Sequence, residues 1–193
     1  MKLIVGLGNP GHTFHGTRHN VGFQVIQELA ERYRVPVTQR VLSQREGRPT
    51  AVYGDYEDRG ESVRLVMPLT MMNASGDALR DMAVAPGALL LVCDDVHLPL
   101  GTLRLRAEGG AGGHHGLASC LEALGTEQVP RLRLGVGVEP LPQDLRAFVL
   151  SRFQIPEWPL AEQMMAQAVD ACEWWVREGI GPAMNRYNRA PET

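Results

Sequence analysis

Cysteine and long apolar runs are both scarce in this sequence. The 193 residues include only Cys93, Cys120 and Cys172 as cysteines. A small, odd number does not make a disulfide framework, so we expect a reducing compartment, the cytoplasm. No apolar run reaches the roughly 18 residues of a membrane-crossing helix. The apolar stretch in MKLIVGLG stops at glycine and is shorter than a secretory signal requires.

An excess of one charge sign is also missing. Lys and Arg number 19 and Asp and Glu number 22, giving a net charge of −3, and Lys2 is the only lysine. This balance argues against a protein whose whole surface binds nucleic acid, although arginines gathered in one place could still hold such a partner. With 44% hydrophobic residues, the chain has the composition of a folded globular protein.

Strand-like and helix-like segments alternate along the chain. Apolar runs and alternating patterns predict strands at 2–6, 51–56, 62–67, 88–93, 102–106 and 131–138. Apolar positions at helical spacing predict helices at 20–34, 75–85, 114–124 and over most of the last ~40 residues. No repeat or long flexible linker divides the chain. We therefore expect one α/β domain over residues 1–193 with a partly parallel sheet.

The first turn, Gly6 to Gly11, matches the G-x-G-x-x-G pattern of dinucleotide-binding folds. In such a fold the helix begins at once, because its free N–H groups must face the pyrophosphate. Here Pro10 and the polar stretch HTFHGTRHN delay the helix. No acidic residue follows a second strand near 35–40 to hold a ribose hydroxyl either. We therefore reject a nucleotide cofactor, and no other cofactor is expected.

Three blocks carry a specific resemblance. They are GLGNPGHTFHGTRHNVGF at 6–23, PLTMMNASG at 68–76 and DDVHLPLGTLRLRAEGGAGGHHGL at 94–117, with looser support from LRLGVG and FVLSRF further on. In this order and spacing they closely resemble the bacterial-type peptidyl-tRNA hydrolase family. The resemblance implies a single α/β domain with a central mixed, mostly parallel, twisted sheet flanked by helices. It also implies a monomeric carboxylic ester hydrolase that cleaves peptidyl-tRNA and so recycles tRNA from aborted translation.

The resemblance also assigns roles to residues at matching positions. His19 would be the general base and Asp94 its orienting carboxylate. Arg106, where the family usually carries lysine, and Arg133 would contact terminal phosphates at the acceptor end of tRNA. The remaining contacts to substrate would come from Asn9, Phe14, Met72, Asn73 and His115.

Elementary chemistry supports the same residues. Ester hydrolysis needs a water molecule that loses a proton as it attacks, and an imidazole is suited to accept that proton near neutral pH. A carboxylate bonded to the other ring nitrogen fixes the tautomer and stabilises the imidazolium. Asp94 directly follows the predicted strand 88–93, so it should lie at the carboxyl edge of the sheet. Asn9 and Asn73 can each donate and accept, which suits a peptide carbonyl or a developing oxyanion.

Two departures from the family pattern stand out. His115 replaces the asparagine that the family typically carries in His-Asn-Gly-Leu, and an imidazole cannot donate and accept in the geometry of an amide. Phe14 replaces a frequent tyrosine, which removes a hydroxyl but keeps the ring. The segment after Val138 also lacks a basic residue that is frequent in relatives.

Three alternatives to a histidine-based hydrolase stay open at this point. The departures allow a non-catalytic, RNA-binding relative of the same fold, like the organellar splicing-factor members. A metal could be held by the acidic and histidine residues of the third block, although the family needs none. Cys93 beside Asp94 could be a nucleophile, although it ends an apolar strand. The candidate metal ligands are Asp94, Asp95, His97, His114 and His115.

Overall fold

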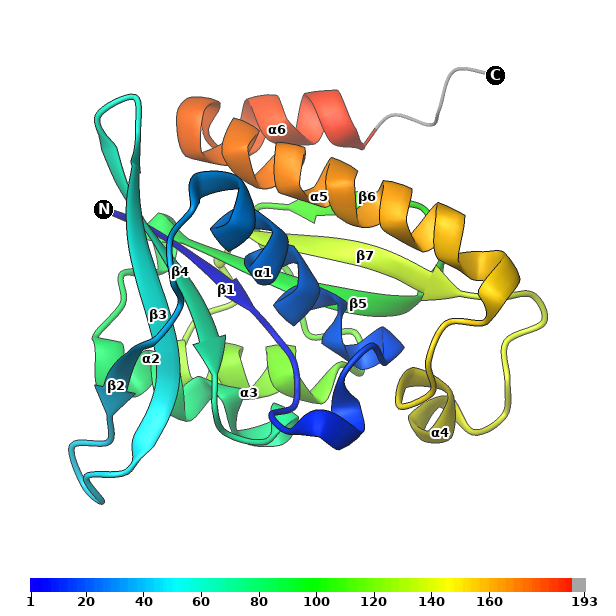
Figure 1. The fold of residues 1–193 in the computed structure, drawn as a ribbon, viewed down its shortest axis with the longest axis horizontal. Coiled ribbons are helices and arrows are strands. Elements are labelled where there is room, and N and C mark those ends of the chain that lie inside the picture. The colour runs from blue at the N-terminus through cyan, green and yellow to red at the C-terminus, as the bar shows by residue number, and fades with distance from the viewer. Residues whose placement is uncertain (189–193) are drawn as a thin grey trace.

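Seven strands form one mixed sheet in the computed structural model, which describes residues 1–188 (Figure 1). The spatial order of the strands is β2-β3-β4-β1-β5-β7-β6. Their bounds are β1 Lys2–Gly6, β2 Gln39–Leu42, β3 Pro49–Asp58, β4 Glu61–Pro68, β5 Leu89–Pro99, β6 Leu103–Arg106 and β7 Arg131–Gly137. The last five residues of the predicted domain, 189–193, lie outside the described part of the chain.

The centre of the sheet is parallel and its two sides are antiparallel. Strands β4, β1, β5 and β7 run parallel to one another, whereas β2 pairs with β3, β3 with β4 and β6 with β7 in antiparallel fashion. The central strands are the apolar ones, because both of their faces are covered by helices. The expectation of a mixed α/β sheet flanked by helices is confirmed.

Helices cover both faces of the sheet (Figure 1). One face carries α1 (Val21–Tyr33), α5 (Trp158–Glu178) and α6 (Ile180–Tyr187), and the other carries α2 (Ser75–Met82) and α3 (His115–Leu124). The short helix α4 (Leu145–Val149) follows β7 and precedes α5. Among the described helices, none combines the length and apolar character needed to cross a membrane.

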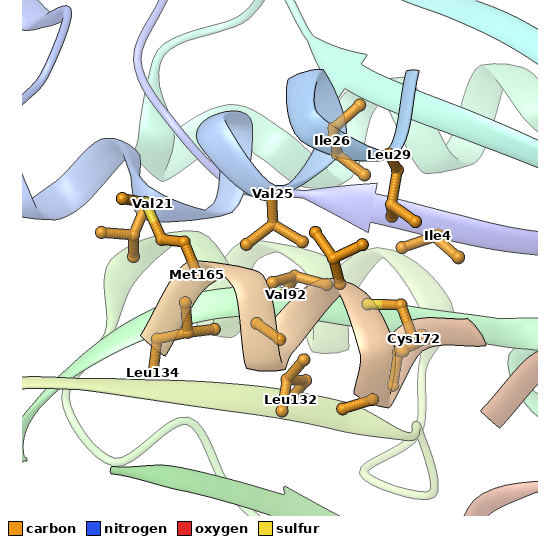
Figure 2. Close-up of a cluster of buried hydrophobic side chains, with 14 of the residues drawn as sticks. Ile4, Val21, Val25, Ile26, Leu29, Val92, Leu132, Leu134, Met165 and Cys172 are labelled. Carbon is orange, nitrogen blue, oxygen red and sulfur yellow. The ribbon is translucent and has the colours of Figure 1, made fainter. Parts of the chain in front are cut away.

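A core on each face of the sheet holds these layers together. Figure 2 shows the larger core, in which apolar side chains of α1 and α5 meet those of the central strands. Val25 of α1 and Val92 of β5 are fully buried there. Alternate strand residues such as Leu91 point to the opposite face, into the core beneath α2 and α3. The two cores fix the positions at which the loops leave the sheet.

Three predicted boundaries differ from the structure. Helix α2 ends at Met82 rather than near 85, because Ala83 adopts a left-handed backbone with φ of 50°. Strand β5 continues to Pro99 instead of ending at Cys93, because β7 supplies backbone partners for the polar residues that follow. The strand placed near 35–40 begins only at Gln39.

Candidate active site

A cavity of about 750 Å³ opens at the carboxyl end of the parallel strands. Strand β1 pairs with β5 only as far as Val92, so the β5 residues beyond Val92 are not paired with β1. This is the edge at which loops of parallel sheets converge. All but one of the predicted site residues line the cavity: Asn9, Phe14, His19, Met72, Asn73, Asp94, His115 and Arg133. Arg106 does not.

The predicted contact between His19 and Asp94 is present. Nδ1 of His19 lies 2.7 Å from Oδ1 of Asp94. A second imidazole meets the same oxygen, since Nε2 of His114 lies 2.9 Å from it. The two rings are tilted by 46° with their centroids 4.9 Å apart. Two imidazoles that are far apart in the sequence thus converge on one carboxylate oxygen.

The surrounding bonds decide which ring nitrogens carry protons. Nδ1 of His114 accepts the N–H of Leu117 at 3.1 Å, so a neutral His114 carries its proton on Nε2 and donates it to Asp94. His19 likewise donates from Nδ1 to the carboxylate. Nε2 of His19 is then unprotonated in the neutral ring and can accept a proton from water.

The Asp94 side chain is only 3% exposed, and its charge is stabilised by its neighbours. Burial by itself would raise the pKa of this carboxyl group. The charge and hydrogen bond of His114, together with the hydrogen bond of His19, outweigh burial and hold the pKa of Asp94 well below its usual range. Asp94 is therefore ionised at neutral pH and can stabilise an imidazolium beside it.

The backbone of His19 is anchored by the preceding residue. His19 lies in a 3-10 turn, η2 (Arg18–Asn20), immediately before α1. The buried Arg18 side chain pairs with Glu157 at 2.6 Å and lies between the rings of Phe148 and Phe153, 4.5 and 4.8 Å from their centroids. A buried arginine held on several sides keeps this turn in one position relative to α4 and α5.

Asn9 is built into the scaffold as well as lining the cavity. It is 5% exposed, and its Oδ1 accepts the backbone N–H of Met72 at 2.8 Å. Its backbone N–H and C=O both bond the Asn20 side chain at 2.9 Å. One lone pair of the side-chain oxygen is thus used within the protein, and the Nδ2 amino group has no hydrogen bond to another described residue. A substrate contact by Asn9 stays a prediction.

The other polar residues of the cavity are more exposed. Asn73 lies in η3 (Met72–Ala74), and the N-cap of α2 is Ala74, which makes no side-chain cap bond. His115 is the exposed first residue of α3. Apolar residues from two segments far apart in sequence also line the cavity: Met71, Met72, Leu145, Val149 and Leu150. Phe14, in η1 (His12–Phe14), is half-buried at the same cavity.

The two predicted phosphate contacts differ in position. The register of β6 and β7 sets Arg106 opposite Arg131 and Arg104 opposite Arg133, which places four arginines on one face of the sheet. Only Arg133 reaches the cavity. Arg131 is buried and bonds the carbonyls of Val129 at 2.6 Å and Glu127 at 3.1 Å, as well as that of Gly109. Arg131 thus fixes the glycine-rich loop ahead of α3.

Arg133 is ion-paired with a buried acid. Its Nη2 contacts Oδ2 of Asp95, whose side chain is only 4% exposed, whereas the Arg133 side chain is 30% exposed. The other oxygen of Asp95 accepts the backbone N–H of His97 at 2.8 Å. Removing the arginine would leave a buried carboxylate without its charge partner, which would be destabilising.

The metal and thiol alternatives can be compared with this geometry. Among the described residues, His19, Asp94 and His114 form the one group whose ligand atoms lie close enough for a metal, within 4.8 Å of one another. A metal on Nε2 of His114 would displace the proton that this nitrogen donates, while Nδ1 is already an acceptor. Cys93 is buried, and burial raises the pKa of its thiol far above neutrality, so the geometry does not favour a thiolate nucleophile.

His114 is the residue that sequence reasoning missed. The sequence presents His114 only as a candidate metal ligand, and it is the neighbouring His115 that departs from the family pattern. The structure brings His114 to Asp94 because it occupies the N-cap of α3, whose side chain turns back toward the helix. The sequence signal for this role is the place of His114 between a glycine-rich loop and an apolar helix, where an N-cap residue is expected.

Comparisons with known proteins place the chain in a family. The pattern that defines the family described as Peptidyl-tRNA hydrolase matches residues 3–193. A peptidyl-tRNA hydrolase of Syntrophomonas wolfei is 42% identical over 192 residues, covering 97% of this chain and 100% of the relative. One from Synechococcus sp. (strain JA-3-3Ab) is 44% identical, covering 97% and 83%. The crystal structure of peptidyl-tRNA hydrolase from Acinetobacter baumannii superposes with a TM-score of 0.85 at 31% identity, covering 97% and 94%.

Proposed function

The chain belongs to the peptidyl-tRNA hydrolase family, and we propose that His19 and Asp94 perform its hydrolysis in the cavity described above. As a member of this family the protein is a hydrolase that acts in translation on peptidyl-tRNA. The products are a free peptide and a tRNA that can be aminoacylated again. The single observation that supports the proposed site is the 2.7 Å contact between the imidazole and a buried, ionised carboxylate.

The first step is the attack of water on the ester carbonyl. A water molecule beside Nε2 of His19 gives its proton to that nitrogen as its oxygen bonds the acyl carbon. The imidazolium that forms is stabilised by Asp94 through the hydrogen bond from Nδ1. When the tetrahedral intermediate collapses, the same imidazolium returns a proton to the leaving 3′ ribose oxygen. No covalent intermediate with the protein is needed.

Charge that develops on the carbonyl oxygen needs donors. Asn9 lines the cavity and its side-chain oxygen accepts the N–H of Met72, which fixes the orientation of the amide, so its amino group can act as a fixed donor. Asn73 directly follows Met72, whose backbone N–H is bonded to Asn9. His115 takes the place of the asparagine usual in the family and can supply one donor or one acceptor. The apolar lining at Met72, with Phe14 nearby, would take side chains of the peptide.

His114 has a positioning role in this proposal. By donating to the same oxygen as His19, it holds the carboxylate in a single orientation and helps to keep it ionised. The N–H of Leu117 in turn fixes the His114 ring. The chain of bonds runs from the backbone of α3 through one imidazole to the carboxylate and then to the base, which is typical support for a preorganised site.

The acceptor end of the tRNA would lie along the arginines of β6 and β7. Arg133 at the cavity and Arg106 further along the same face can contact successive phosphates of the acceptor end. We expect the enzyme to act in the cytoplasm as a monomer and to need no metal. The non-catalytic RNA-binding alternative is not favoured, because the named relatives are hydrolases and the His19–Asp94 contact is retained.

Turnover of a defined substrate tests the site. Purified protein is incubated with an N-acetylated aminoacyl-tRNA, and released tRNA is measured. We expect the His19→Ala variant to lose about 10²–10⁴-fold in kcat, the usual contribution of a general base. His15→Ala is the matched control, since His15 lies in the same segment but is exposed and does not line the cavity. Retention of more than a few per cent of activity in His19→Ala would overturn the assignment.

A further inference from the structure

Asp95 lies next to the proposed catalytic carboxylate and has no part in the mechanism above. Its side chain is 4% exposed, which is unusual for a charged group. One oxygen is held by the N–H of His97 at 2.8 Å, so the carboxylate cannot turn freely. The other oxygen is ion-paired with Arg133. This contact lacks the geometry of a hydrogen bond to Oδ2, so it is an ion pair of charges in contact.

Arg133 is engaged along one edge of its guanidinium group only. Nη2 faces Asp95, and within residues 1–188 no protein acceptor bonds its remaining N–H groups. The side chain is 30% exposed and lines the cavity beside Gly112. A guanidinium has five N–H groups in a rigid fork, so an arginine held along one edge can still present its other edge to an anion.

An incoming phosphate could in principle either displace Asp95 or join it. Displacement would leave a buried carboxylate without its charge partner, and that loss exceeds what one partly exposed phosphate contact returns. Joining keeps both anions on the same cation, with the phosphate at the open edge. Joining also spares the substrate the entropy of ordering a long side chain, because Asp95 has already ordered it.

We propose that Asp95 is a positioning residue that holds Arg133 ready for a phosphate of the tRNA substrate and so selects substrates that carry one. This inference rests on the phosphate contact assigned to Arg133 in the proposed function. The two adjacent aspartates then have separate roles. Asp94 supports proton transfer by His19, and Asp95 orients the arginine that contacts the phosphate. Asp95 touches neither the ester nor the water, so its effect should appear in binding and not in the chemical step.

The test is the Asp95→Asn variant, assayed with N-acetylated aminoacyl-tRNA at several salt concentrations. The amide keeps an oxygen for the N–H of His97 but removes the charge that holds the arginine. We expect KM to rise about tenfold with kcat unchanged within about twofold, the scale of one charge-assisted contact. The slope of log(1/KM) against log salt should become shallower by about one unit, which corresponds to the loss of one phosphate contact. Hydrolysis of an N-acetylated aminoacyl ester of adenosine, which carries no phosphate, should be unchanged.

Asp55→Asn is the matched control. Asp55 pairs with Arg64 at 2.7 Å on β3 and β4 and does not line the cavity, so the same substitution breaks a more exposed Asp–Arg pair without touching the proposed site. Arg133→Lys is a second variant of the site. It retains the positive charge but loses the fork that serves two anions, so we expect it to raise KM as Asp95→Asn does. Thermal unfolding of each variant checks that it is folded.

The comparison with Arg133→Ala separates the two proposals. If Asp95 acts through Arg133, the double variant Asp95→Asn/Arg133→Ala should bind no more weakly than Arg133→Ala alone. A raised KM in Arg133→Ala with an unchanged or lowered KM in Asp95→Asn would overturn the role of Asp95 and keep the phosphate contact. An unchanged KM in Arg133→Ala would overturn both. The Kd of uncharged tRNA gives the same comparison without hydrolysis.

Discussion

Asp94 and Asp95 are consecutive residues of β5, both buried at the mouth of one cavity, yet they hold partners of different chemistry. Asp94 bonds two imidazoles, His19 and His114, and an imidazole can exist as a neutral ring or as an imidazolium. Asp95 faces the guanidinium of Arg133, which keeps its charge at any working pH. The alternation of side chains along the strand directs the two acids toward opposite faces of the sheet and hence toward these different partners.

The difference shows that the partner, and not the acid, sets what a buried carboxylate can do. A carboxylate beside a neutral imidazole can stabilise a charge that appears only during the reaction, which lowers a barrier. A carboxylate beside a permanent cation can only orient that cation, which affects binding. We therefore expect substitutions on the Asp94 side to change kcat and those on the Asp95 side to change KM.

Asp94→Asn should have the largest effect on this comparison. The amide keeps the size of the side chain but cannot stabilise an imidazolium, and it can hold His19 in the wrong tautomer. We expect kcat to fall about 10²–10⁴-fold with KM changed little, measured with N-acetylated aminoacyl-tRNA. Comparable activity in this variant and the wild type would mean that His19 acts without its carboxylate.

His114→Ala should have an intermediate effect on the same side. Asp94 keeps its bond to His19 but loses the second donor that fixes its orientation, so we expect kcat to fall roughly tenfold. Loss of the N-cap of α3 should also lower the free energy of unfolding by about 1 kcal/mol. Kinetics and urea unfolding of one preparation measure both effects. A kcat loss as large as that of Asp94→Asn would instead make His114 a direct participant.

Arg133→Ala and Arg106→Ala should act on KM alone and by different amounts. Arg133 lines the cavity, whereas Arg106 lies further along the β6–β7 face. We expect KM to rise about tenfold for Arg133→Ala and about threefold for Arg106→Ala, with each removing about one unit from the salt slope. Titrations from low to high salt measure both values. If the salt slope stays the same in both variants, the proposal that these arginines contact phosphates is wrong.

Acid stability should show the smallest effect. The folded-state pKa of Asp94 is lowered, so its contribution to stability is present above the pKa of the unfolded chain, about 4, and is lost as pH falls below that value. Asp94→Asn should therefore be less stable than the wild type at pH 7, and the difference should narrow as the pH falls through about 4 toward 3. Urea unfolding across this range gives the two curves. A constant difference would show that the charge of Asp94 contributes nothing.

Local patterns were sufficient for most of the fold but not for its boundaries. The apolar run at 88–93 and the helical spacing after His19 predicted β5 and α1, because each depends on residues within a few positions. The extension of β5 through Asp94 and Asp95 was missed, since it depends on pairing with β7, some 40 residues further on. Helix α2 ended early because Ala83 takes a backbone conformation that sequence alone does not signal for alanine.

The amino-acid sequence by itself determined the alternation of strands and helices and the candidacy of His19, Asp94, Asn9 and Asn73, because motif residues and periodic patterns are local properties. The tertiary structure decided which neighbours these residues meet. It placed His114 and not His115 on the carboxylate, committed the oxygen of Asn9 to Met72, paired Arg133 with Asp95 and left Arg106 outside the cavity. These outcomes depend on strand register and on the packing of helices from both faces, which bring together residues far apart in the chain.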